Sequence, residues 1–174
     1  MKHFLIVVDM QKDFVDGALG TPEAAAIVPA VCERIRSFVG EIIVTYDTHP
    51  DTYLDTAEGK KLPVTHCVKD TEGWQLDAAV ASVLDGKDYC VVEKPTFGSV
   101  DLPFLVRGMA GEEAFDVTLI GLCTDICVVS NALLLKAHFP EVPIAVESAL
   151  CAGVTPDSHA AALQTMTMCQ IDVK

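Results

Sequence analysis

The chain has 174 residues and a formal net charge of −13, and 51% of its residues are hydrophobic. This length suits one domain over residues 1–174, and the hydrophobic content excludes an intrinsically disordered chain. The acidic balance argues against nucleic acid as a partner, because phosphate binding needs clustered lysine and arginine. Apolar runs stop far short of the roughly 20 residues that cross a membrane. Seven cysteines without a Cys-x-x-Cys pair favour the reducing cytoplasm.

Short, continuous, β-branched runs alternate with amphipathic stretches along the chain. The runs predict six strands: Phe4–Asp9, Glu41–Asp47, Tyr89–Glu93, Asp116–Gly121, Ile144–Ser148 and Ile171–Val173. The amphipathic stretches predict five helices: Pro22–Val39, Trp74–Leu84, Leu102–Met109, Asp125–His138 and Asp157–Met168. Continuous apolar strands are typical of parallel sheets buried on both faces. The alternation therefore predicts an α/β fold with right-handed crossovers.

Chemically reactive side chains occur where the predicted strands end. Asp9 ends the first strand and Asp47 the second, Lys94 follows the third, and the sequence GLCTDIC with Cys127 follows the fourth. Ligands of doubly wound sheets bind beyond the carboxyl ends of the strands. We therefore expect these groups to converge on one crevice. The alternatives are a helix-capping role for Asp9 and a solvated side chain for Lys94.

Cys127 is the candidate nucleophile. It falls in the first turn of a predicted helix, where free N–H groups and the positive end of the helix dipole favour a thiolate. The same N–H groups could stabilise an oxyanion. The competing interpretation is a buried, inert thiol. Cys123 lies in the same turn and is a second candidate, and a Cys123–Cys127 redox pair is a further alternative.

The segment from Thr48 to Gly73 breaks the alternation, and a long irregular segment in a compact domain is typically functional or disordered. It begins just after Asp47 and contains His49 and His66. Two imidazoles and one carboxylate suit zinc, iron or manganese and leave positions open for water or substrate. The alternative is that all three are ordinary polar loop residues.

These motifs together resemble the isochorismatase-like cysteine hydrolase superfamily. The resemblance rests on VVDMQKDF with Asp9, on Lys94 after its strand, and on GLCTDICV with Cys127, in that order and spacing. Asp47-x-His49 and the later His66 resemble the metal site of its nicotinamidase branch. The resemblance implies a single-domain, three-layer, flavodoxin-like fold with helices on both faces of a parallel sheet. It also implies a homo-oligomer.

The resemblance further implies a mechanism. Cys127 would attack an amide carbonyl to form a thioester, Asp9 would transfer the protons, and Lys94 would hold both electrostatically. The backbone amides of Cys123 and Cys127 would bind the oxyanion. A cis peptide bond is expected between Leu122 and Cys123.

The expected substrate is a small amide, with nicotinamide first, and the expected cofactor is a divalent metal, zinc before iron or manganese. Four residues are predicted to line the substrate pocket: Phe14, Tyr53, Leu62 and Trp74. Leu62 stands where nicotinamidases often have an aromatic residue, and one extra residue separates Pro63 from His66. Two alternatives remain open. One is a hydrolase of another small amide or carbamoyl compound, and the other is a non-catalytic binding or thiol-redox protein.

Overall fold

The computed structural model describes residues 1–174, and its six strands form one sheet. The strands are β1 (Lys2–Val8), β2 (Glu41–Asp47), β3 (Tyr89–Lys94), β4 (Phe115–Leu122), β5 (Ile144–Ala152) and β6 (Asp172–Val173). Their spatial order is β3-β2-β1-β4-β5-β6, and every neighbouring pair is parallel. The predicted parallel α/β sheet is confirmed, and its strand order reverses direction between β1 and β4.

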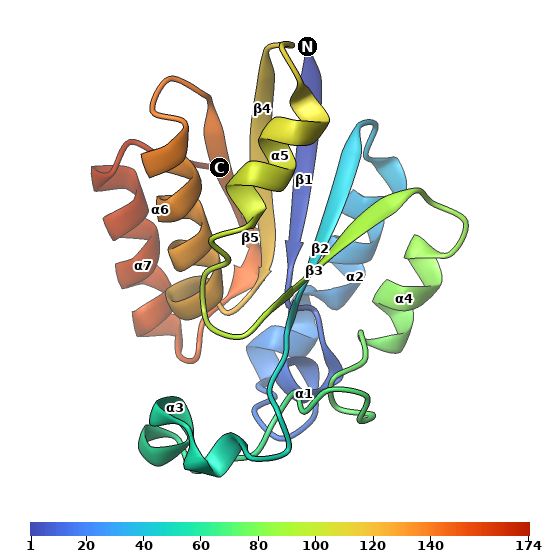
Figure 1. Ribbon diagram of the computed structural model, residues 1–174, viewed down its shortest axis with the longest axis vertical. Helices are drawn as coiled ribbons and strands as arrows, with labels where there is room; N and C mark the ends of the chain where they lie inside the picture. The colour runs from blue at the N-terminus through green and yellow to red at the C-terminus, as the bar shows by residue number, and fades with distance from the viewer.

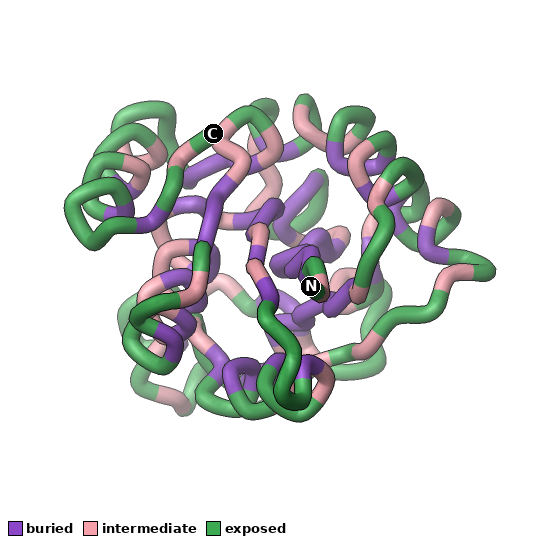
Figure 2. Tube along the Cα trace, turned by 90° about the horizontal axis from the view of Figure 1, so that it is seen from above, coloured by how far each residue is buried: buried purple, intermediate pink, exposed green.

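Helices cover both faces of this sheet, so the fold has three layers (Figure 1). One face carries α5 (Leu102–Ala110), α6 (Val129–His138) and α7 (Pro156–Met168), and the other carries α1 (Lys12–Val15), α2 (Pro22–Ser37) and α4 (Ala78–Leu84). Ile6 and Val8 of β1 pack into one core and Leu5 and Val7 into the other, since successive strand residues face opposite sides. Buried residues accordingly gather inside a shell of exposed ones (Figure 2).

Helix boundaries differ from the sequence expectation at two places. The helix expected from Trp74 begins at Ala78, because the Asp77 side chain accepts hydrogen bonds from the N–H groups of the first turn and caps it there. The helix expected from Asp125 begins as a π-helical turn, Thr124–Val128, which continues into α6. No helix is long and apolar enough to cross a membrane.

The predicted irregular segment between β2 and β3 contains two short helical pieces. A 3₁₀ turn spans Tyr53–Asp55, and α3 spans Ala57–Lys61. The Thr56 hydroxyl accepts a hydrogen bond from Gly59 N at 2.9 Å and so caps α3. In Figure 1, α3 lies with α1 at the end of the sheet toward which the strands run.

The strand register aligns the ends of β1, β2, β3 and β4. Val8 of β1 pairs with Thr45 of β2 and with Gly121 of β4, and Asp47 pairs with Lys94 of β3. At Gly121 φ is +114°, and a Cβ there would collide with the Val8 carbonyl oxygen. A glycine at this position therefore lets β4 approach β1 closely where Asp9 leaves the sheet.

Candidate active site

Asp9, Lys94 and Cys127 meet in a buried cluster at the carboxyl ends of the strands. The Lys94 ammonium lies 2.6 Å from Asp9 Oδ2 and donates to Cys127 Sγ at 3.4 Å. It also lies 3.3 Å from Asp47 Oδ1. Asp9 and Lys94 are fully buried, and Cys127 is 4% exposed. The structure thus brings together the three side chains that the motifs singled out.

The end of β1 fixes the Asp9 carboxylate. The Thr45 hydroxyl donates to Asp9 Oδ1 at 2.6 Å, and the Asp9 backbone N–H lies 3.2 Å from both the hydroxyl and the carbonyl oxygen of Thr45. Asp9 has φ of +44°, a conformation that non-glycine residues adopt at some energetic cost. The neighbouring strand therefore sets both the backbone and the carboxylate of Asp9.

Cys127 lies in the π-helical turn that follows β4. The peptide bond between Leu122 and Cys123 is cis, as the resemblance implied. Ile126 N and Val128 N both donate to the Cys123 carbonyl oxygen, at 3.1 and 3.0 Å. These bonds close the turn on itself and place Cys127 inside it, next to Lys94.

Asn131 ties this turn to the segment that follows Lys94. Its Nδ2 donates to the Cys127 carbonyl oxygen at 2.8 Å, and its Oδ1 accepts from Ser99 N at 2.9 Å. Asn131 is fully buried, and the side chain of a residue four positions after Cys127 lies on the same helix face. One amide side chain therefore couples the turn that contains Cys127 to the β3–α5 loop.

Burial and charge set the protonation states of the cluster. Burial raises the pKa of the Cys127 thiol well above its ordinary value, and the Asp9 charge raises it further, while Lys94 opposes both. Burial also raises the pKa of Asp9, against the lowering effect of Lys94. Burial alone would lower the pKa of Lys94, but the neighbouring anionic groups outweigh it and raise the pKa. The cluster therefore holds a neutral thiol, an ammonium group and a carboxyl group that binds a proton readily.

A group of metal-type ligands lies beside this cluster. Asp47, His49, Glu58 and His66 each offer one ligand atom, and these atoms lie within 4.8 Å of one another. His49 Nε2 and His66 Nε2 lie 3.0 and 3.6 Å from Asp47 Oδ2. His49 Nε2 is buried and, although it lies 3.0 Å from Asp47 Oδ2, it makes no hydrogen bond of good geometry there, which is costly unless a ligand occupies it. This donor set of two imidazoles and two carboxylates suits a divalent cation.

The surroundings of the histidines hold the ligand group in place. The Tyr53 ring packs 4.7 Å from the His49 ring and 4.9 Å from the His66 ring. His66 Nδ1 contacts the Val64 carbonyl oxygen at 2.7 Å, which leaves Nε2 to face Asp47. Burial would raise the pKa of Asp47, but the two imidazoles and Lys94 outweigh it and keep this carboxyl ionised.

A cavity of about 50 Å³ joins the two groups. Its lining includes Cys127 of the first group and Asp47, Glu58 and His66 of the second, together with apolar side chains that include Phe14 and Leu62. A substrate in this cavity would therefore contact the thiol and the metal-type ligands at once.

Two of the four residues predicted to line the pocket lie elsewhere. Tyr53 is fully buried behind the two histidines, and Trp74 packs on Tyr46 and donates from Nε1 to Thr48 Oγ1 at 2.9 Å. The second aromatic side chain in the cavity wall is instead Phe97, three residues after Lys94. The sequence analysis placed the second aromatic side chain between β2 and β3, whereas Phe97 lies in the loop after β3.

Sequence reasoning also missed three polar residues of the site. Thr45 occupies the second position before Asp47, and alternate strand residues share a face. Asn131 has the four-residue helical spacing from Cys127. Both signals were present in the sequence. Glu58 had no such signal, since its approach to His49 depends on the turns between β2 and β3.

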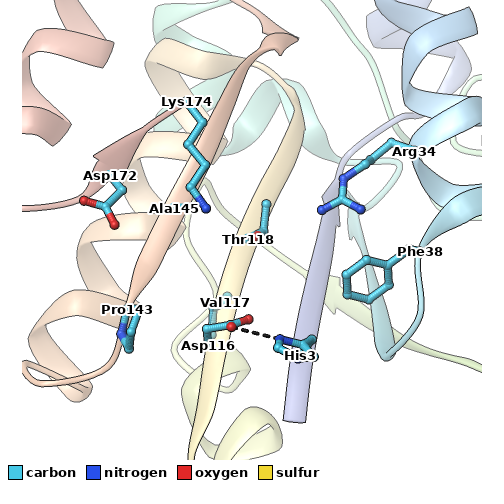
Figure 3. Close-up of a pocket in the computed structure, with 10 residues that line it drawn as sticks. All are labelled: His3, Arg34, Phe38, Asp116, Val117, Thr118, Pro143, Ala145, Asp172 and Lys174. Carbon is cyan, nitrogen blue, oxygen red and sulfur yellow. Dashed lines mark hydrogen bonds and ion pairs between the residues drawn. The ribbon is translucent and has the colours of Figure 1, made fainter. Parts of the chain in front are cut away.

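A separate pocket of about 220 Å³ lies toward the amino ends of the strands (Figure 3). Its walls include His3 of β1 and Arg34 of α2, and His3 lies six residues before Asp9 along the first strand. Two of its side chains contact carboxylates: His3 Nδ1 lies 2.9 Å from Asp116 Oδ2 (Figure 3), and Arg34 lies 2.8 Å from Glu147. These paired groups lie away from the thiol, the ammonium and the metal-type ligands.

Comparison with known proteins agrees with this geometry. Residues 3–173 match the isochorismatase domain family. A nicotinamidase/pyrazinamidase of Mycobacterium tuberculosis is 26% identical over 182 residues, which cover 97% of this chain and 96% of that protein. The crystal structure of a Pyrococcus horikoshii pyrazinamidase in complex with zinc is similar with a TM-score of 0.83 and 28% identity, covering 100% of this chain and 99% of that one. N-carbamoylsarcosine amidase from Thermoplasma acidophilum is similar with a TM-score of 0.80 and 26% identity, covering 100% and 96%. The chain therefore belongs to the isochorismatase family of hydrolases.

Proposed function

We propose that this protein is a metal-containing cysteine amidohydrolase that converts a small neutral amide, nicotinamide first, to its carboxylic acid and ammonia. The observation that carries the proposal is the position of Lys94 Nζ. It contacts both Asp9 and Cys127, and Cys127 lines a cavity that also exposes three metal-type ligands. A nucleophile, a proton carrier and a binding group for the substrate are thereby brought to one small space.

The proton path follows from the protonation states of the cluster. The Cys127 thiol is neutral at rest, so it needs a base, and the Asp9 carboxylate takes its proton as sulfur attacks the amide carbonyl. The Lys94 ammonium, 3.4 Å from sulfur, stabilises the negative charge that develops there. Backbone N–H groups of Cys123 and Cys127 receive the oxyanion in this scheme.

Collapse of the tetrahedral intermediate passes the proton from Asp9 to the departing ammonia and leaves a thioester on Cys127. The Asp9 carboxylate then removes a proton from water, which attacks the thioester. The C–S bond breaks, the Cys127 sulfur takes that proton back from Asp9, and the acid is released. The raised pKa of Asp9 suits both steps, because a carboxyl group that binds a proton readily is a better base and still returns the proton to nitrogen.

Asp47, His49, Glu58 and His66 would hold the metal, for which we propose zinc. When bound, the metal would supply a Lewis acid that receives the ring nitrogen of the substrate and orients its amide. The buried His49 Nε2, which makes no hydrogen bond, and the mixed imidazole and carboxylate set support this assignment. The zinc complex of the similar Pyrococcus horikoshii pyrazinamidase supports the choice of metal.

The charge of the cavity favours a neutral amide over a carbamoyl amino acid. Asp47 and Glu58 line the cavity, and neither lysine nor arginine is among its lining residues. The proposed metal would balance Asp47 and Glu58, so a substrate with its own carboxylate would find neither a lysine nor an arginine of the cavity to pair with. The similarity to N-carbamoylsarcosine amidase makes N-carbamoylsarcosine the comparison substrate, and we expect slower turnover of it than of nicotinamide.

The decisive experiment measures ammonia release from nicotinamide by the zinc-loaded protein. Cys127→Ala serves as the blank, and Cys169→Ala, at an exposed cysteine, serves as the matched control. We expect release by the wild type and by Cys169→Ala, and none by Cys127→Ala. Equal release by the Cys127→Ala protein would refute the nucleophile assignment. Because the nucleophile must remain a thiol, we place this activity in the cytoplasm. The homo-oligomer remains a prediction, which size-exclusion chromatography would test.

A further inference from the structure

A second cavity, of about 240 Å³, adjoins the cavity of about 50 Å³ that Cys127 lines, which we call the reaction cavity. Five of its eight lining residues also line the reaction cavity: Phe14, Leu19, Leu62, Cys123 and Ile126. The other three are Thr21 and Ala24 at the start of α2 and Val154 after β5. A molecule in the reaction cavity therefore has this second cavity directly beside it.

The chemistry of the second cavity is apolar. Its lining contains no charged side chain. The Thr21 hydroxyl is occupied as the cap of α2, where it accepts from Ala24 N at 3.0 Å. A polar group placed here would lose its hydrogen bonds to water without replacement, whereas an apolar group would gain from leaving water.

A wider depression of about 630 Å³ also adjoins the reaction cavity, since Glu58, Leu62, Phe97 and Ile126 line both. Its lining is mixed, because it also contains Lys61 and Asp125. The 240 Å³ cavity has no charged side chain in its lining. An apolar part of a bound substrate would therefore meet a more uniformly apolar surface in the 240 Å³ cavity than in this depression.

The volumes of the cavities also favour a substrate that occupies both of them. The reaction cavity has about 50 Å³ and its apolar neighbour about 240 Å³, whereas small-molecule sites typically begin near 300 Å³. Neither cavity reaches that size alone, but the two together approach it.

We propose that the 240 Å³ cavity is a subsite for an apolar substituent of the substrate. The protein would then prefer primary amides whose ring or acyl chain carries an alkyl or aryl group beyond the part held next to Cys127. This inference rests on the proposed amidohydrolase function and narrows its substrate class. Ala24 and Val154 become specificity-determining residues, because they line the subsite and not the reaction cavity.

The test measures binding by calorimetry to the zinc-loaded Cys127→Ala protein, which needs no turnover. The ligands are nicotinamide and nicotinamides with a methyl, ethyl or propyl group at ring carbon 4, 5 or 6. We expect the affinity to rise about fourfold per methylene at one ring position at least. The added substitution Ala24→Leu, which fills the subsite, should remove this gain, and Ala25→Leu, at the exposed neighbouring position of α2, should keep it.

Val154→Trp, at a side chain that is 50% exposed, provides the same test at the rim of the subsite if Ala24→Leu does not fold. The proposal is overturned if every alkyl group weakens binding, or if the gain persists in both subsite variants. Hydrolysis of nicotinamide by the wild type is followed separately. If binding gains appear without hydrolysis, the proposed function fails and the subsite stands. If nicotinamide is hydrolysed but no alkyl group improves binding, the proposed function stands and the subsite fails.

Discussion

Thr45→Val should shift the pH dependence of the reaction through Asp9. The Thr45 hydroxyl donates to Asp9 Oδ1 at 2.6 Å inside the protein, and valine has nearly the same shape without the donor. A hydrogen bond to a charged group contributes about 1.5–3 kcal/mol, and one pKa unit corresponds to about 1.36 kcal/mol. Loss of this bond destabilises the Asp9 carboxylate. We therefore expect the pKa of Asp9, already raised by burial, to rise by a further 1–2 units or so.

The assay is the pH profile of kcat/KM for the amide substrate, whose acidic limb reports the base of the free enzyme. Thr45→Val should move that limb to higher pH by about 1–2 units, whereas Thr45→Ser, which keeps the hydroxyl, should leave it in place. An unmoved limb in Thr45→Val would refute the assignment of Asp9 as the base.

Thr45→Val should also lower the stability of the protein, by an amount that depends on pH. The hydrogen bond stabilises only the ionised form of Asp9 in the folded protein. Thr45→Val should therefore lower the free energy of unfolding by up to about 1.5–3 kcal/mol at high pH, where folded Asp9 is ionised. The deficit should disappear as the pH falls below the native pKa of Asp9, because both proteins then fold with a protonated carboxyl group. Urea unfolding of both proteins at several pH values measures this difference in the free energy of unfolding.

Three other predictions concern the framework of the site. Lys94→Met leaves Asp9 without its cation and should lower the free energy of unfolding by about 3–5 kcal/mol; a loss below 1 kcal/mol or so in urea titrations would contradict the buried ion pair. Glu58→Gln should weaken zinc binding by about tenfold or more, measured in competition with a chromophoric chelator. The control Asp51→Asn, at an exposed carboxylate of the same segment, should leave zinc affinity unchanged. Gly121→Ala should destabilise the fold by about 2 kcal/mol or more, while Gly108→Ala, with open space around it in α5, should stabilise it by about 0.5–1 kcal/mol; similar melting temperatures for both would refute the close approach.

The sheet was predictable because its strands are buried on both faces. A strand such as β1 must be apolar at nearly every position, and the run from Phe4 to Val8 records this in the sequence. The end of such a run then predicts where a side chain leaves the sheet. Because parallel strands end at one edge, Asp9, Lys94 and Cys127 could be expected together without knowledge of the helices.

The segment between β2 and β3 was not predictable in the same way. Its conformation depends on turns and short helices that have no hydrophobic period, so Glu58 could not be placed near His49 from the sequence. Tyr53 and Trp74 were predicted to line the pocket as substitutes for the aromatic residues that nicotinamidases have after the Asp-x-His motif. The structure instead buries Tyr53 against His49 and His66, where its ring packs on both imidazoles.

Charge balance connects the two halves of the site. Asp9, Asp47 and Glu58 contribute three carboxylates within a small buried region, and Lys94 is the ammonium group that contacts the first two. With all four groups ionised, two negative charges remain uncompensated, and uncompensated charge inside a protein is costly. Burial accordingly raises the pKa of Glu58. A divalent cation between Asp47 and Glu58 would balance the excess, so the arrangement that we propose to activate Cys127 also favours a metal beside it.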